Sequence, residues 1–139
     1  SLAKPLFPFG YGLSYTDYEY ADVKTDKKSL TLEQVNNGEH FEISVTVKNI
    51  GDYASFEIVQ LYVRDVVASR MRPVRELKGF KKVFLDPGQS EVVEFDIDSS
   101  LLKFYDINKR DWNIEKGTFT VCIGSSSRDL RSWARFELK

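Results

Sequence analysis

Apolar and polar residues alternate with a period of two along much of the chain. The clearest run covers residues 41–48, where every second residue is apolar and the residues between them are polar. Because successive side chains of a β-strand point to opposite faces, such a run predicts a strand with one face on a core and the other in water. Similar runs predict strands at residues 58–64, 93–97, 118–123 and 134–138, and weaker signals lie at residues 18–23 and 77–85. The strand at residues 58–64 is apolar on much of both faces.

Turn-forming residues separate these runs at the intervals expected of an all-β domain. Clusters that contain glycine or proline lie at residues 36–38, 49–52, 86–88 and 115–117. Helical periodicity is short by comparison, and residues 99–105 are predicted to form at most one helical turn, capped by a serine. The pattern predicts an antiparallel β-sandwich of about seven strands, built of two sheets with Greek-key connections.

The first residues of the chain differ in composition from the predicted strands. Residues 5–16, PLFPFGYGLSYT, combine Phe7, Phe9, Tyr11 and Tyr15 with two prolines and two glycines. Proline and glycine interrupt helices and long strands, and aromatic rings on such a backbone need an apolar surface to pack on. We therefore predict that residues 1–17 are a connector that docks on a neighbouring domain and that residues 18–139 form the sandwich. The alternative is that these rings fold back onto the flank of the sandwich itself.

Four segments resemble parts of the C-terminal fibronectin type III-like domain of glycoside hydrolase family 3 enzymes. They are PLFPFGYGLSYT at residues 5–16, IVQLYVRD at 58–65, RPVRELKGFKKVFLDPGQS at 72–90 and GSSSRDLR at 124–131, in the expected order. The resemblance implies an immunoglobulin-like (fibronectin type III-like) fold and a parent enzyme of the β-glucosidase or β-xylosidase type, which hydrolyses terminal β-linked sugars with retention. In that family the catalytic aspartate and the acid/base glutamate belong to the preceding domains, so no catalytic residue carries over to this chain.

The charge balance argues against a nucleic-acid partner. The chain has 20 Lys and Arg residues against 21 Asp and Glu residues, so its net charge of −1 gives no overall attraction to polyanions. No apolar run approaches the ~20 residues that span a bilayer. One histidine and one cysteine are too few for the common zinc sites, and we predict no metal, no cofactor and no internal disulfide. We expect His40 to be solvated at a strand start, and Cys122 to be partly covered and to point away from the central core.

Carboxylates are numerous, but their positions do not suggest catalysis. Glycoside hydrolysis needs two carboxylates at a fixed separation, one of them with a raised pKa. Acids such as Glu94 and Asp96 alternate with apolar residues on a predicted strand and are therefore expected to face solvent. A calcium loop starting at Asp106 also fails, because Asp111 holds its glycine position and Gly117 holds its closing glutamate position.

Basic residues gather between residues 64 and 82. This segment contains two acids and seven basic residues. The basic residues are Arg64, Arg70, Arg72, Arg75, Lys78, Lys81 and Lys82. They suggest either an anionic ligand or, more economically, ion pairs with the acids of residues 86–98 on neighbouring strands. By the resemblance, the loop with Arg70, Arg72 and Arg75 is a candidate to face the catalytic domains, since guanidinium groups bond carboxylates and carbonyls in fixed geometry.

Aromatic residues make up 14% of the chain and raise the question of sugar stacking. Trp112 and Trp133 are the candidates, because a flat aromatic ring can lie against the apolar face of a pyranose. Packing in the core or on a sheet face is the simpler interpretation, since aromatic residues supply much of the buried area of β-sandwiches.

The leading hypothesis is a non-catalytic accessory domain that stabilises upstream catalytic domains of the same polypeptide. A periplasmic or secreted parent is the working hypothesis for localisation, and the sequence itself leaves the compartment open. The alternative, from a different functional class, is an independent carbohydrate-binding or adhesion module that contacts a polysaccharide through an exposed aromatic platform. A plain spacer or dimerisation domain is a third possibility.

Overall fold

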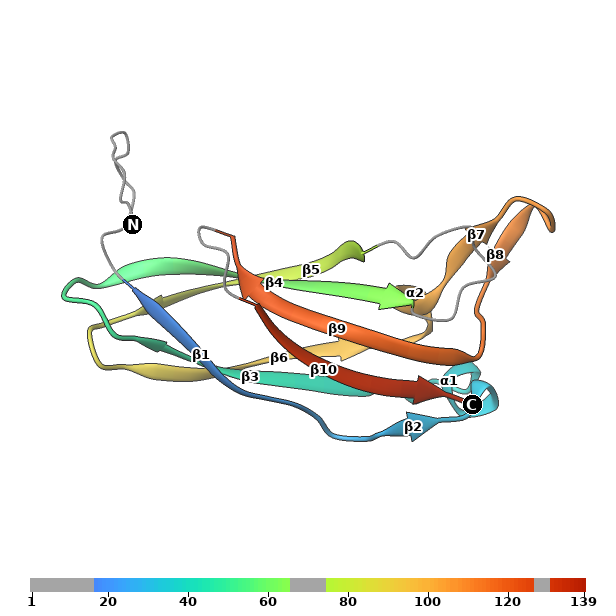
Figure 1. Ribbon diagram of the computed structural model, residues 1–139, viewed down its shortest axis with the longest axis horizontal. Coiled ribbons are helices and arrows are strands. Elements are labelled where there is room, and N and C mark those ends of the chain that lie inside the picture. Colours follow the sequence, from blue (N-terminus) through green and yellow to red (C-terminus); the bar gives the residue numbers. More distant parts are fainter. Residues whose placement is uncertain (1–16, 66–74, 127–130) are drawn as a thin grey trace.

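The structure, a computed structural model, describes residues 17–65, 75–126 and 131–139. Within these residues the chain forms ten strands and two short helices (Figure 1). In chain order they are β1 (Tyr18–Thr25), β2 (Ser29–Leu30), α1 (Leu32–Asn36), β3 (Phe41–Asn49), β4 (Ser55–Asp65), β5 (Arg75–Leu85), β6 (Ser90–Ile97), α2 (Ser99–Leu102), β7 (Phe104–Asp106), β8 (Asp111–Asn113), β9 (Gly117–Ser125) and β10 (Arg131–Leu138).

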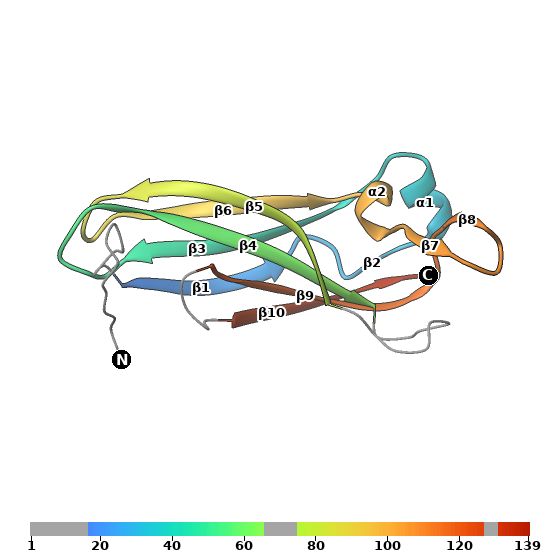
Figure 2. The ribbon, with the colours of Figure 1, turned by 90° about the horizontal axis from the view of Figure 1, so that it is seen from above.

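Most of the strands form two layers that pack face to face (Figures 1 and 2). One sheet has the order β1-β3-β6 and the other the order β2-β10-β9-β4-β5. The pairings between neighbouring long strands are antiparallel, whereas the short β2 runs parallel to β10. Among the long strands the chain crosses between the sheets after β3, after β5 and after β6, so the predicted antiparallel sandwich with Greek-key connections is confirmed. The β7–β8 hairpin extends from the end of the sandwich that also holds α1 and α2.

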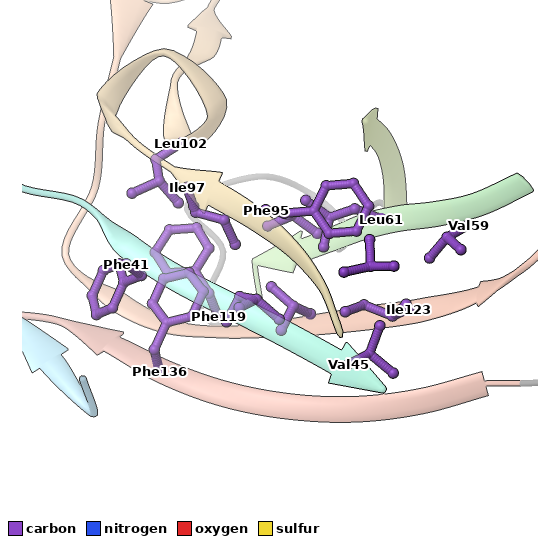
Figure 3. Close-up of a cluster of buried hydrophobic side chains, with 14 of the residues drawn as sticks. Phe41, Val45, Val59, Leu61, Phe95, Ile97, Leu102, Phe119, Ile123 and Phe136 are labelled. Carbon is purple, nitrogen blue, oxygen red and sulfur yellow. The ribbon is translucent and has the colours of Figure 1, made fainter. Parts of the chain in front are cut away.

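The alternation in the sequence directs one face of each sheet into a shared core. Four side chains of β3 are 0% exposed: Phe41, Ile43, Val45 and Val47. They meet inward side chains of the other sheet in one apolar cluster (Figure 3). The ring centroid of Phe136 on β10 lies 4.1 Å from that of Phe41 and 5.4 Å from that of Phe119. Removing such side chains from water stabilises the fold by about 25 cal/mol per Å² of apolar area.

Asn49 holds several segments together at the end of the sandwich where β1 begins. Its side chain is fully buried, and its Nδ2 donates hydrogen bonds to the carbonyl oxygens of Tyr53 (2.8 Å) and Leu85 (2.9 Å). Its Oδ1 accepts a hydrogen bond from the backbone N–H of Gly51 at 2.9 Å. A buried amide satisfied in this way costs little free energy. The turn between β3 and β4 is thereby fixed against the end of β5.

The seven strands predicted from the sequence correspond to β1, β3, β4, β5, β6, β9 and β10 and are confirmed. The short turn predicted at residues 99–105 is α2, but the prediction of a serine cap was wrong. The cap is Asp98, whose carboxylate accepts hydrogen bonds from the backbone N–H groups of Ser100 and Leu101. A carboxylate is favoured there because the free N–H groups and the helix dipole place positive charge at the helix start.

The sequence analysis missed α1, β2 and the β7–β8 hairpin. A signal for α1 was present, because Thr31 and Gln34 form a capping box in which each side chain bonds the backbone N–H of the other. The strands β2, β7 and β8 are two or three residues long, which is too short for a period of two to be recognised.

Candidate interaction surfaces

Most of the residues predicted to dock on other domains lie outside the described residues. They are Phe7, Phe9, Tyr11, Tyr15, Arg70 and Arg72. Arg75 begins β5, but its side chain also lies outside the described part of the chain. Their docking role and the domain boundary at residue 17 therefore stay predictions.

Large apolar side chains are exposed on β4 and β5, on the face turned away from the core. Phe56 and Phe84 are directly opposite each other, with ring centroids 4.8 Å apart, and are 57% and 51% exposed. Phe80 is 67% exposed, and Leu77 and Ile58 are exposed on the same face. We refer to Phe56, Ile58, Leu77, Phe80 and Phe84 as the outer apolar face. Contiguous exposed apolar clusters on soluble proteins are often interaction surfaces, so the outer apolar face is a candidate for one.

The outer apolar face was not singled out from the sequence, although two signals were present. Ile58 follows Phe56 at a spacing of two, opposite in parity to the inward Val59. Phe80 and Phe84 also share one parity on β5, opposite to that of the buried Val83 and Leu85. A strand that is apolar on both faces is expected to be covered on both sides.

The basic residues of β5 contact aromatic rings and a neighbouring acid. The Nζ atom of Lys82 lies 4.3 Å from the ring centroid of Phe56, and that of Lys81 lies 5.5 Å from the ring centroid of Phe95. Lys78 pairs with Glu76, with Nζ and Oε1 3.5 Å apart. The prediction that the acids of residues 86–98 lie on strands neighbouring these lysines was wrong, because β5 and β6 belong to different sheets.

The two tryptophans lie on different exposed surfaces. Trp112 on β8 is 62% exposed and packs edge-on against Tyr105 of β7, with ring centroids 5.7 Å apart and an interplanar angle of 82°. Ile107, in the turn of the same hairpin, is also exposed. Trp133 on β10 is partly exposed on the outer side of the five-stranded sheet, where its cross-strand partner is Cys122. The apolar core contains neither indole ring.

A buried carboxylate, that of Glu57, lies inside the sandwich and was not predicted. Glu57 is 4% exposed, and its Oε2 accepts a hydrogen bond from the Tyr20 hydroxyl at 2.6 Å. Burial raises the pKa of Glu57, and hydrogen bonds from Tyr20 and Ser125 oppose this rise. Burial, together with the adjacent carboxylate, raises the pKa of Tyr20. The hydroxyl of Tyr18 donates to the carbonyl oxygen of Ser55 at 2.6 Å, so these contacts join β1 of one sheet to β4 of the other.

The geometry around Glu57 suits a structural link rather than glycoside hydrolysis. Glycosidases need a second carboxylate across a substrate site. Among the described residues the buried polar side chains are those of Asn49, Glu57 and Ser125, which include no second acid. A raised pKa can mark a catalytic acid, but it also follows from burial alone.

His40 and Cys122 lie apart and form no site together. His40 is partly exposed just before β3, with its Nε2 3.6 Å from Oδ1 of Asp96, so the prediction of a solvated histidine is confirmed. Cys122 lies outside the core cluster, as predicted, but it is 0% exposed rather than partly covered. Its cross-strand partners, Tyr62 and Trp133, are bulky enough to cover a thiol between them. No group of three or more His, Cys, Asp or Glu side chains in the described ranges could hold a metal ion.

None of the helices in the described ranges has the length and apolar character that crossing a membrane requires.

Comparison with known proteins identifies both a domain family and a group of longer relatives. A family model described as a fibronectin type III-like domain matches residues 57–127. Thermostable β-glucosidase B of Acetivibrio thermocellus is 50% identical over 127 residues, which cover 91% of this chain and 16% of that protein. β-Glucosidase BoGH3A of Bacteroides ovatus is 43% identical and is matched over 96% of this chain and 17% of its own length. The chain thus spans about a sixth of the length of these curated relatives.

Solved structures give the same result for the fold. The β-glucosidase of Listeria innocua in complex with gluconolactone has a TM-score of 0.77 and 38% identity, over 97% of this chain and 18% of that one. The family 3 (GH3) β-glucosidase of Bifidobacterium adolescentis has a TM-score of 0.76 and 36% identity, over 95% of this chain and 18% of that one. In both cases the similar region is a small part of a longer polypeptide.

Proposed function

Since the chain belongs to the fibronectin type III-like domain family, we propose that it is the non-catalytic C-terminal accessory domain of a glycoside hydrolase family 3 enzyme. The observation that carries this proposal is the coverage: β-glucosidases match over 91% and 96% of this chain but over only 16% and 17% of their own length. The parent would hydrolyse terminal β-linked sugars as a β-glucosidase or β-xylosidase, with its catalytic residues in upstream domains of the same polypeptide.

The role proposed for the domain is to stabilise those upstream domains by packing against them. Both sheets contribute to one buried apolar cluster, so the domain has a core of its own. This favours a rigid domain that packs against its neighbours over a flexible tail. The connector residues Phe7, Phe9, Tyr11 and Tyr15, together with Arg70, Arg72 and Arg75, remain candidates for that contact.

The mass of the native polypeptide tests the proposal. An antibody raised against this chain should detect a band far above 16.1 kDa in an extract of the source organism, and that band should co-purify with β-glucosidase or β-xylosidase activity. A native band at the mass of the chain itself would contradict the proposal, because a free domain would have no catalytic domains to stabilise.

A second candidate function, carbohydrate binding by the domain itself, is favoured by the β7–β8 hairpin. Trp112 presents an exposed indole, and Tyr105 holds it from one side. Side chains with hydrogen-bonding groups, including Asn108 and Arg110, are exposed in the same hairpin. Exposed aromatic rings beside polar groups are the usual components of sugar-binding surfaces.

Retention on an insoluble polysaccharide tests this second function. If the hairpin binds sugar, the chain should be retained saturably on the polysaccharide. Trp112→Ala should then make the binding free energy less favourable by about 1–3 kcal/mol, a typical cost of removing a stacking aromatic side chain. Ile107→Ala, in the turn of the same hairpin, is the matched control and should leave retention unchanged. Equal retention of both variants and the unmodified chain would show that Trp112 does not bind the polymer.

A further inference from the structure

We propose that the outer apolar face of β4 and β5 is where the upstream part of the same polypeptide packs, as a folded domain whose contact surface has an apolar centre and acidic groups at its rim. This inference rests on the proposed function and adds to it the location and chemistry of the contact.

The size of the outer apolar face is the first observation in support. Phe56, Phe80 and Phe84 are each more than half exposed. Because burying an aromatic side chain removes roughly 150–250 Å² from water, these three rings alone leave about 300 Å² exposed. Ile58 and Leu77 extend this area to the range of the largest patches on ordinary monomers, about 300–600 Å². A typical interface buries about 800 Å² per partner, so the face would form the centre of such a contact.

Among the described residues, the outer side of the other sheet has no comparable cluster of exposed large apolar side chains. The exposed positions of β6 carry the acids Glu94 and Asp96, and the large apolar residue exposed on that strand is Val92. In a domain whose two outer surfaces both face water, the strands of both sheets would alternate apolar inward residues with polar outward residues. The difference between the two sheets indicates that one outer side, that of β4 and β5, is normally covered.

Charge on the outer apolar face favours an acidic partner. On the outward positions of β4 and β5 whose side chains are described, the charged residues are Arg64 and Lys82, and both are basic. The Nζ atom of Lys82 lies 4.3 Å from the centroid of the Phe56 ring, so a positive charge lies directly against one ring of the outer apolar face. A partner surface with carboxylates at these positions would be complementary, whereas a second copy of the same face would place like charges together.

The described chain enters the sandwich near one end of this face. The carbonyl oxygen of Asp17 accepts a hydrogen bond from the backbone N–H of Ile50 at 2.9 Å, which anchors the start of β1 beside the turn before β4. The hydroxyl of Tyr18 then donates to the carbonyl oxygen of Ser55, the residue before Phe56. Residues upstream of Asp17 are therefore joined to the sandwich at the end where Phe56 and Phe84 lie.

Cysteine labelling in two settings tests the inference. Phe80→Cys, and separately Phe56→Cys, would be introduced into the 139-residue chain and into the longer polypeptide that contains it, and the rate of reaction with a maleimide would be measured. In the isolated chain both thiols should react quickly. In the longer polypeptide the reaction should slow by at least about tenfold, since about 1.4 kcal/mol of opening free energy reduces the open population tenfold.

Two features of the chain serve as controls. Val92→Cys, on the opposite sheet, replaces a side chain that is 58% exposed and should react equally fast in both settings. The native Cys122 is 0% exposed, so its reaction would reveal unfolding of a variant. If Phe80→Cys does not fold by this criterion, Phe56→Cys provides the measurement.

Each outcome supports or overturns the inference. Protection in the longer polypeptide alone supports it. Equal reactivity in both settings would overturn it while leaving the proposed function intact, because a long native polypeptide could dock through another surface. Protection in both settings would also overturn it. Light scattering would then show whether a second copy or residues of the chain itself cover the face. A native polypeptide of the size of this chain would instead remove the proposed function on which the inference rests.

Discussion

Replacement of Phe136 by alanine is expected to lower the free energy of unfolding by about 3–5 kcal/mol. Phe136 is 1% exposed, and its ring lies between those of Phe41 and Phe119, with centroid distances of 4.1 and 5.4 Å. The substitution removes most of a buried aromatic side chain and leaves a cavity between the sheets. Because single domains are stable by only about 5–15 kcal/mol, a loss of this size leaves a substantial unfolded population.

Urea unfolding of the isolated chain measures this effect, with the midpoint reporting stability and the slope reporting the area exposed. Ile107→Ala is the control, because Ile107 is 80% exposed in the β7–β8 turn and its truncation should change stability by no more than about 0.5 kcal/mol. A loss below about 1 kcal/mol for Phe136→Ala would contradict the placement of this ring at the centre of the core.

The strands could be predicted from the sequence because the core pattern is local. Phe41, Ile43, Val45 and Val47 have the period of two that a half-buried strand requires, and all four are buried. The identity of the residue that caps a helix depends instead on the exact residue at which the helix begins. The sequence pattern does not define that point, and Asp98 took the place expected for a serine.

The candidate surfaces were harder to predict because they depend on which strands become neighbours. Phe56 and Phe84 are 28 positions apart in the chain, and only the pairing of β4 with β5 brings their rings into contact. The same dependence explains the error over the lysines of β5. Short spacing along the chain suggested adjacent strands, yet β5 and β6 are in different sheets. Glu57 was overlooked because an acidic residue is normally expected to face solvent. Its carboxylate is buried because its position on β4 points into the sandwich.

Replacement of Tyr20 by phenylalanine is expected to destabilise the sandwich by about 1.5–3 kcal/mol near neutral pH, the usual net value of a hydrogen bond to a charged group. The Tyr20 hydroxyl donates to the buried carboxylate of Glu57 at 2.6 Å and links β1 to β4 across the two sheets. Phenylalanine keeps the ring, so the apolar packing changes little. A loss similar to that of removing an exposed hydroxyl, below about 0.5 kcal/mol, would contradict this role for the bond.

The pH dependence of the free energy of unfolding tests the contribution of the buried Glu57 carboxylate. Burial raises the pKa of Glu57 above its ordinary value of 4.5, so the native state holds this proton more tightly than the unfolded chain does. The stability that Glu57 contributes is therefore fully present below pH 4.5 and is lost as the pH rises through the native pKa. Tyr20→Phe removes a bond that favours the charged form, so its cost should grow with pH over this interval.

Glu57→Gln should show the opposite dependence on pH. Glutamine keeps an acceptor for the Tyr20 hydroxyl but carries no charge to bury, so the stability of this variant relative to the unmodified chain should rise as the pH increases above 4.5. Glu94→Gln, at an exposed position of β6, controls for the loss of one negative charge. Urea unfolding at a series of pH values gives all the profiles. If Glu57→Gln and Glu94→Gln gave the same profile, the carboxylate of Glu57 would have to reach water in the folded protein, and the link between the sheets would rest on Tyr18 and Asn49 instead.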